Sequence, residues 1–267
     1  MQGKQAYFYL INKPTYSILK YLTYLVLIMS QLMQIKKEIK KAANPEKALL
    51  LQRFFKTGKG EYGEGDIFLG ITVPESRKIA TKFKDLSLQD VESLLQSQIH
   101  EERLIALLFL VHNYSLAKKE RDEKKKEEIY NFYLKSTKYI NNWDLVDLSS
   151  HQIIGDYLIE KDKSILYDLA KSKNLWERRI AVISTFYFIK NNKFDDSLNI
   201  ALLLLKDKHD LIQKAVGWML REVWKKDSDV LENFLRKNYK NMPRTMLRYA
   251  IEHFPESKRK AYLKGGM

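Results

Sequence analysis

"LIQKAVGWMLREV", residues 211–223, is the stretch that decides the fold class. Its apolar residues follow the three- and four-residue spacing of one helix face, at Val216, Met219, Leu220 and Val223. Three other stretches also place a basic or polar residue just before a mostly apolar segment: EERLIALLFL (101–110), WERRIAVIST (176–185) and PRTMLRYAIE (243–252). With a further helix expected over 143–158, neighbours in this set lie roughly 32 to 40 residues apart. This period predicts an α-solenoid of stacked helix pairs, a curved superhelix with its binding surface on the concave face.

Residues that break helices are rare in the same region. No proline occurs between Pro74 and Pro243, and the only glycines in that interval are Gly155 and Gly217. Strands joined by tight turns need more such residues. The sequence therefore predicts an all-α chain.

The composition narrows the class of partner. The 267 residues carry a formal net charge of +14, which favours an acidic partner such as nucleic acid or an anionic membrane surface. The alternative is a basic protein kept soluble by its charge. The absence of cysteine excludes disulfides, thiolate metal sites and cysteine nucleophiles, and it is compatible with a cytoplasmic protein. The five histidines show no ligand spacing, so we expect neither a metal nor a cofactor.

The N-terminal region contains an apolar run, YLTYLVLIMSQLMQI (21–35). Its 15 residues are fewer than the roughly 20 that a spanning helix needs, so we expect no membrane anchor. An amphipathic pattern begins near Met33. We therefore expect residues 1–32 to be an extension outside the core and residues 33–267 to form a single domain, with Met29 and Met33 as possible alternative starts.

A glycine-rich stretch, GKGEYG (58–63), has the spacing of a dinucleotide-binding turn. It follows a helical pattern rather than a strand, and Glu61, Glu64 and Asp66 would repel a phosphate. We interpret residues 58–71 as a loop leading into a helix that starts at Val73, with Tyr62 as a possible contact to a partner.

The stretch NNWDLVDLSS (141–150) places a tryptophan and carboxylates in this basic chain. Trp143 and Asp147 are four residues apart and so lie on one helix face, whereas Asp144 fits a first-turn role near a cap at Asn141 or Asn142. Asp147 has no such role. A structural interpretation remains open, with Trp143 packed at a repeat junction and Asp147 bonded to a neighbouring arginine.

Later helices offer partners for this pair. Arg178 and Arg179 follow Trp176, and Trp218 precedes Arg221 by one turn. Stacked repeats would bring such side chains together as an aromatic and basic surface around one carboxylate. Arginine neutralises phosphates and indole packs against sugar or base, so this surface suits nucleic acid.

These residues also carry a resemblance to a known family. FLGI (68–71) with VPESRKIA, NNWDLVD, WERRIAVIS, IQKAVGWMLRE and MPRTMLRYAIEHF together resemble the AlkD-type DNA alkylation repair family, alkylpurine DNA glycosylases built from HEAT-like repeats. The resemblance covers about residues 33–260. It implies a lesion site made of Trp143, Asp147, Arg179 and Trp218. The stretch GKGEYGEGD is longer than the matching helix junction of the plainest members, which leaves DNA contacts at that end open.

The resemblance implies a reaction as well as a fold. Alkylation at purine N3 or N7 makes the base a cationic leaving group, so a carboxylate need only stabilise the charge that develops on the deoxyribose and orient water. We assign this role to Asp147, the walls of the site to Trp143 and Trp218, and a phosphate contact to Arg179, which could also pair with Asp147 in the free protein. The DNA-binding residues that we expect are Arg178, Arg221, Lys214, Arg244, Arg248 and Tyr62.

The expected partner is double-stranded DNA containing alkylated purines, bound by a monomer with no obligate protein partner and no membrane. Two other classes stay open at this point. A non-catalytic helical-repeat protein that binds branched or bent DNA would need the same basic face but would be indifferent to Asp147→Asn. A protein-interaction scaffold would bind an acidic protein and show little affinity for duplex DNA.

Overall fold

The computed structural model describes residues 31–83 and 86–266, and within these ranges it is built of helices and loops. A single isolated bridge, between Ile67 and Ile99, is the only β pairing in this part of the chain. The all-α prediction is thus confirmed. The chain divides into two compact units, Met1–Phe109 and Leu110–Met267, which we describe separately. The prediction of one domain over 33–267 stays a prediction, and of the expected extension only Gln31 and Leu32 lie within the described residues.

The first unit contains a helix over residues 31–41, then α2 (Pro45–Phe54), α3 (Val73–Lys82), α4 (Leu88–Leu95) and the start of α5 (His100–Glu120). Ile35 and Ile39 are fully buried, so the core of this unit begins close to the expected Met33. The helix predicted to start at Val73 is α3. Its start is fixed by a capping box, in which Thr72 and Glu75 satisfy each other's backbone amides.

Residues 56–72 form the loop expected between α2 and α3. The backbone N–H of Gly58 donates to Glu61 and that of Gly60 to Glu64, at 2.9 and 2.8 Å. In a phosphate-binding turn such amides point at the ligand, whereas here two of them are bonded to carboxylates of the same loop. The far end of the loop is held by Glu101, whose carboxylate accepts hydrogen bonds from the N–H groups of residues 69–71.

The second unit continues α5 and adds a series of stacked helices: α6 (Glu123–Lys135), α7 (Trp143–Asp147), α8 (Asp156–Leu158), α9 (Ser164–Ala170), α10 (Leu175–Lys190), α11 (Asp195–Leu203), α12 (Asp210–Lys226), α13 (Ser228–Asn238), α14 (Arg244–Ala250) and α15 (Glu256–Lys264). Short turns lie between them: the 3₁₀ turns η1 (Thr137–Tyr139) and η3 (Tyr239–Asn241) and the π-helical turn η2 (His151–Gly155).

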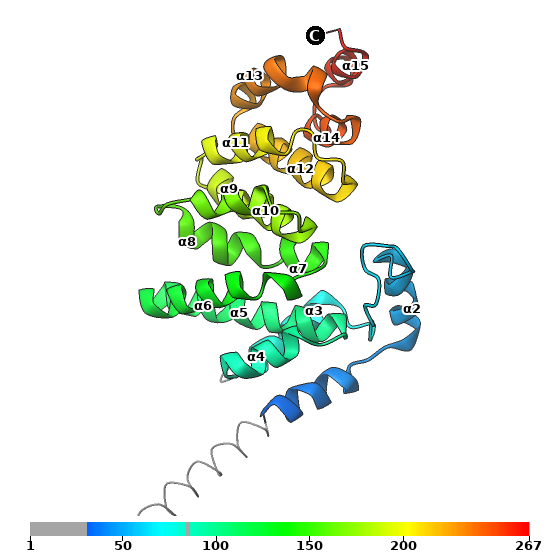
Figure 1. Cartoon of the computed structure of the whole chain (residues 1–267), viewed down its shortest axis with the longest axis vertical. Helices are drawn as coiled ribbons and strands as arrows, with labels where there is room; N and C mark the ends of the chain where they lie inside the picture. The colour runs from blue at the N-terminus through cyan, green and yellow to red at the C-terminus, as the bar shows by residue number, and fades with distance from the viewer. Residues whose placement is uncertain (1–30, 84–85, 267) are drawn as a thin grey trace, which may run out of the picture. The chain divides into compact units, whose positions relative to one another are not determined.

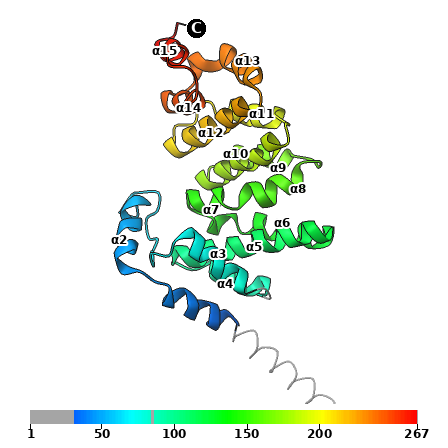
Figure 2. The same cartoon turned by 180° about the vertical axis from the view of Figure 1, so that it is seen from behind.

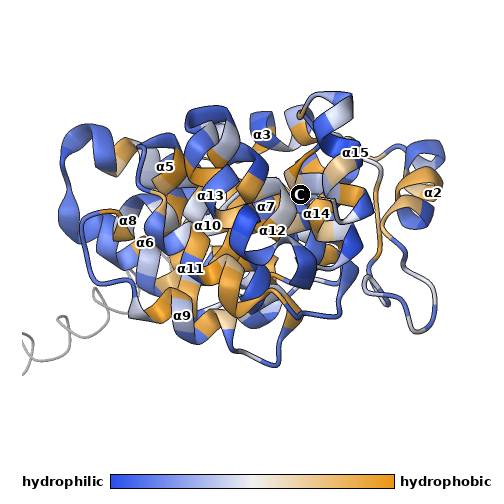
Figure 3. Cartoon of the chain, turned by 90° about the horizontal axis from the view of Figure 1, so that it is seen from above, coloured by the Kyte–Doolittle hydropathy of each residue, from blue (hydrophilic) through white to orange (hydrophobic). Residues whose placement is uncertain are grey.

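The order of packing in this unit follows the order of the chain. Helix α10 packs against α7, η2 and α9 before it and against α11 and α12 after it, and α12 packs in turn against α13 and α14 (Figures 1 and 2). Helices α10 and α11 carry many of the apolar residues seen in Figure 3. This arrangement confirms the predicted solenoid of helical repeats, since each helix pair buries its apolar side against its neighbours.

The segment 143–158, expected as one helix, is interrupted. Helix α7 ends at Asp147, and the chain resumes after a turn as η2 and α8. The hydroxyl of Ser149 donates to the carbonyl oxygen of Leu145 at 2.5 Å, a local bond of the kind that bends helices. The prediction of a continuous helix was wrong for this reason, but Trp143 and Asp147 still share one helical turn.

The apolar residues of these helices do not all belong to the core. Leu148, Phe186 and Tyr187 are only partly buried, whereas Phe188 is fully buried. Helical spacing identifies the direction of a buried stripe, but its edges depend on how closely the neighbouring helix approaches.

Two glycines allow helices of the second unit to touch through their backbones. A Cβ atom at Gly155 would lie 2.3 Å from the carbonyl oxygen of Ser184, and one at Gly217 would lie 2.5 Å from that of Met246. Neither distance is possible for a real side chain. These two glycines are therefore required by the close approach of successive helices.

Over residues 31–83 and 86–266, no helix has both the length and the apolar character needed to cross a bilayer. The apolar run 21–35 falls mostly outside the described residues.

Candidate functional site

The centre of the candidate site is an ion pair between α7 and α10. Arg179 donates from Nε to Oδ1 of Asp147 at 2.9 Å and from Nη2 to Oδ2 at 2.7 Å. This two-point geometry matches a guanidinium to a carboxylate and fixes the orientation of both groups. The side chains keep 7% and 14% of their surface exposed, so the Asp147 carboxylate is the more accessible of the two.

Arg179 also reaches the next repeat. Its Nη1 donates to the carbonyl oxygen of Leu211, in the first turn of α12, at 2.7 Å. One guanidinium thus connects α7, α10 and α12. Of its five N–H donors, three make these bonds.

The environment of Asp147 opposes ionisation, and its partner favours it. Burial raises the pKa of the Asp147 carboxyl above its usual range, while the charge and hydrogen bonds of Arg179 act in the opposite direction. Asp144, on the same helix, adds a smaller upward effect on that pKa. The pairing of Asp147 with Arg179 that we expected in the free protein is present.

Trp143 opens α7. The side chain of Asn142 accepts a hydrogen bond from the Trp143 backbone N–H at 2.8 Å, so the predicted cap at this helix start is confirmed as Asn142. The indole of Trp143 is partly buried and lies on the same turn as Asp147.

Trp218 lies on α12, the helix whose first turn is bonded to Arg179. Its indole N–H donates to Glu222 at 3.0 Å, and its ring centroid is 5.8 Å from that of Phe186 on α10. The hydrogen bond to Glu222 and the ring contact with Phe186 therefore fix the orientation of the indole, and part of the residue stays exposed.

The aromatic contacts extend to His151, a residue that no pattern in the sequence singles out. The His151 ring meets Phe186 edge-on at 5.3 Å, so a series His151, Phe186, Trp218 runs from η2 across α10 to α12. We name these three residues the aromatic series. The helical spacing of Phe186 was visible in the sequence, but its contact with η2 was not, because it depends on the interruption of the helix after Asp147.

His151 should make the protein sensitive to acid. Burial, with a smaller contribution from the charge of Lys190, lowers the pKa of His151 from 6.5 to about 4. The unfolded chain therefore takes up a proton near pH 6.5, whereas the folded chain does so near pH 4. Stability is expected to fall as the pH is lowered through this window, because the unfolded state binds more protons there.

The variant His151→Phe tests this expectation. It removes the titrating group and keeps an aromatic ring beside Phe186. Urea denaturation midpoints at several pH values should show that the stability of the variant relative to wild type rises as the pH is lowered from 6.5 to about 4. Parallel pH curves for the two proteins would contradict the assignment.

The six expected DNA-binding residues occupy different environments. Arg178 is bonded to Asp207 at 2.8 Å and also to two backbone carbonyl oxygens, a structural role. Lys214 pairs with Asp210 on the exposed side of α12 at 2.6 Å. Tyr62 belongs to the loop of the first unit. All six residues stay predictions as DNA contacts.

The other three expected residues gather at the C-terminal end of the second unit. One cavity is lined by Arg221 on α12 and by Arg244 and Arg248 on α14. Within residues 31–83 and 86–266, no group of three or more histidine, aspartate or glutamate side chains is arranged to hold a metal ion.

Comparisons with known proteins place the chain among repair proteins. The sequence profile described as "DNA alkylation repair enzyme" matches residues 35–254. The structure resembles that of a predicted DNA alkylation repair enzyme from Enterococcus faecalis, with a TM-score of 0.61 and 17% identity over 80% of this chain and 97% of the other. It also resembles AlkD2 from Streptococcus mutans, with a TM-score of 0.52 and 19% identity over 79% and 99%.

A comparison with curated protein sequences finds no match. The two solved structures share the fold of this chain. Because the family profile spans most of the sequence, from residue 35 to residue 254, the protein belongs to the DNA alkylation repair enzyme family.

Proposed function

We propose that this protein is a DNA glycosylase that hydrolyses the N-glycosidic bond of cationic alkylated purines, of the 3-methyladenine and 7-methylguanine type, in duplex DNA. The observation that carries the proposal is the Asp147 carboxylate, held at two points by Arg179 and still 14% exposed. A carboxylate oriented in this way is suited to stabilising a positive charge brought to its open side.

The chemistry requires an anion more than an acid. A purine alkylated at N3 or N7 is already a good leaving group, and the barrier lies in the positive charge that develops on the deoxyribose. A fixed carboxylate beside that sugar lowers the barrier electrostatically and can orient the attacking water. Burial raises the pKa of Asp147, and the charge and hydrogen bonds of Arg179 oppose this rise. Arg179 therefore favours the ionised form that this role needs.

The tryptophans would confine the nucleotide. The electron-rich faces of Trp143 and Trp218 favour a cationic centre and pack against deoxyribose. Trp218 is suited to act as a wall because Glu222 and Phe186 fix its indole. No step of this mechanism uses a metal or a redox cofactor.

For Arg179 the geometry favours a positioning role over the phosphate contact expected from the sequence. Three of its N–H groups are bonded within the protein, and only 7% of its side chain is exposed. We therefore propose that Arg179 mainly positions Asp147. Its two remaining donors are available for a phosphate of the bound strand.

Selectivity between lesions tests the proposal. Duplexes containing 7-methylguanine should lose the free base, measured by chromatography under single-turnover conditions. Duplexes containing hypoxanthine, a neutral damaged base, should react at least about a hundredfold more slowly, because the neutral base is a poor leaving group and the protein supplies no strong acid. Equal rates on both duplexes would mean that a protein group protonates the base. No release from either, with tight DNA binding, would favour a non-catalytic DNA-binding protein.

A further inference from the structure

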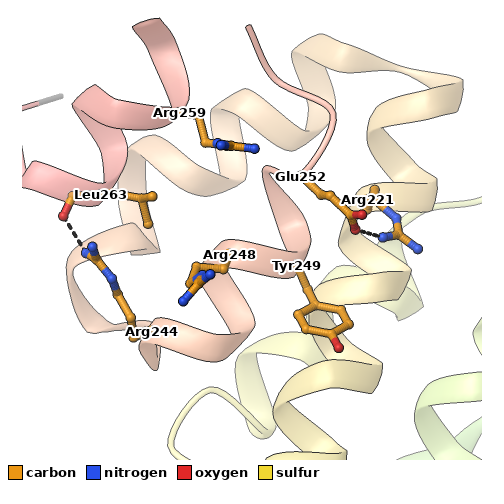
Figure 4. Close-up of a pocket in the computed structure, with 7 residues that line it drawn as sticks. All are labelled: Arg221, Arg244, Arg248, Tyr249, Glu252, Arg259 and Leu263. Atoms are coloured by element: carbon orange, nitrogen blue, oxygen red, sulfur yellow. Dashed lines mark hydrogen bonds and ion pairs between the residues drawn. The ribbon is translucent and has the colours of Figure 1, made fainter. Parts of the chain in front are cut away.

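The C-terminal end of the second unit contains a cavity of about 540 Å³, a size typical of sites for small ligands. We name it the arginine pocket. Four of its lining residues are arginines, as Figure 4 shows: Arg221 from α12, Arg244 and Arg248 from α14, and Arg259 from α15. Tyr249 and Leu263 supply an aromatic and an apolar wall.

Two of the four arginine charges around the pocket are not neutralised by a carboxylate in the described part of the chain. Glu252 is the only acidic residue in the lining, and it pairs with Arg221. Arg259 pairs with Glu256 at 2.9 Å, on the exposed surface outside the lining. Arg244 donates to the carbonyl oxygen of Leu263, a bond that leaves its positive charge unneutralised. Arg248 is exposed, and within the described residues no ion pair involves it.

This excess of positive charge indicates the class of ligand. A backbone phosphodiester carries one negative charge, whereas a terminal phosphate carries about two near neutral pH. Arginine forks bind phosphate oxygens in pairs, and several forks around one cavity suit a group with more oxygens and more charge than a phosphodiester. Tyr249, which follows Arg248 on α14 and lines the same cavity, offers an aromatic ring on which a base can stack.

We propose that the arginine pocket binds the terminal phosphate of a nucleotide, with the nucleoside against Tyr249 and Leu263. Two sources share this chemistry: a free mononucleotide, and a DNA strand that ends in a phosphate. Binding here can be distinguished from the proposed glycosylase activity, because it needs neither Asp147 nor a damaged base, although Arg221, Arg244 and Arg248 are also among the expected DNA contacts.

Two binding measurements on the full chain separate the sources. The first is calorimetric titration with deoxyguanosine monophosphate, compared with deoxyguanosine. The second is fluorescence anisotropy with a labelled single strand that carries either a 5′-phosphate or a 5′-hydroxyl group at its unlabelled end. We expect the phosphate to strengthen binding about tenfold or more in at least one of the two arms. The arm in which it does so identifies the source.

Variants connect the effect to the pocket. Arg248→Ala removes an exposed side chain with little expected effect on folding, and Arg244→Ala with Arg248→Ala removes two of the four charges. Arg236→Ala is the matched control, because Arg236 lies on the neighbouring α13 with 68% of its side chain exposed and outside the pocket. The pocket variants should abolish the preference for phosphate and the control should keep it. No preference for phosphate in either arm, or equal losses in the control and pocket variants, would overturn the inference.

Discussion

Replacing Asp147 by asparagine should reduce the release of 7-methylguanine from duplex DNA by about a hundredfold to a thousandfold. Asparagine has the shape of aspartate and can still accept a hydrogen bond from Arg179, but it lacks the negative charge that, in the proposed mechanism, stabilises the sugar cation. DNA affinity should be unchanged or slightly higher, since a negative charge is removed from a surface that meets phosphates. The measurement is single-turnover base release at matched DNA occupancy.

Two comparisons make this result specific. Asp210→Asn removes the same charge from an exposed carboxylate on α12 and should leave base release within about threefold of wild type. Arg179→Lys keeps the charge beside Asp147 but loses the two-point geometry, so it should slow the reaction less than Asp147→Asn. If Asp147→Asn lowered the melting temperature and DNA binding together with base release, a structural role for Asp147 would be the correct interpretation.

Replacing Gly155 by alanine should destabilise the protein by about 3 kcal/mol or more, a loss of roughly 6 to 12 °C in melting temperature. In most helices glycine to alanine stabilises by about 1 kcal/mol. The sign reverses here because the new methyl group would lie 2.3 Å from the Ser184 carbonyl oxygen and 2.8 Å from the Tyr187 Cβ atom. Both obstacles are backbone or near-backbone atoms, so relief requires α10 to move away.

Gly58→Ala is the control for this effect. A methyl group at Gly58 would meet only the side chain of Glu61, which can rotate away. Thermal denaturation should show little change for this variant. The corresponding contact of Gly217 with Met246 predicts a loss for Gly217→Ala similar to that of Gly155→Ala. A melting temperature for Gly155→Ala that matches wild type would show that the helices separate without cost.

The fold could be predicted because its signals are local and repeated. The spacing of Val216, Met219, Leu220 and Val223 identifies a helix face, and the rarity of proline and glycine rules out a chain of strands and tight turns. The interruption after Asp147 could not be predicted in the same way. It depends on the hydrogen bond from the buried Ser149 hydroxyl to the Leu145 carbonyl oxygen, and periodicity carries no information about such a bond.

The candidate site, like the fold, could be predicted only in part. Asp147 and Arg179 are separated by 32 residues, about one repeat, so stacked helices were expected to bring them together, and they do. The positions of His151 and Arg259 could not be expected. His151 depends on the π-helical turn, and Arg259 meets the other arginines only through the packing of α15 against α14.

The link from Arg179 to both Asp147 and Leu211 has a consequence for how substrate binding is used. The carboxylate is held by the folded chain alone, so it loses no rotational freedom when a duplex arrives. In the proposed reaction, the affinity gained from phosphate contacts would then be available to press the damaged nucleotide against a group already in place. Such a glycosylase would act on many weakly bound positions along DNA, because its carboxylate is oriented before each encounter.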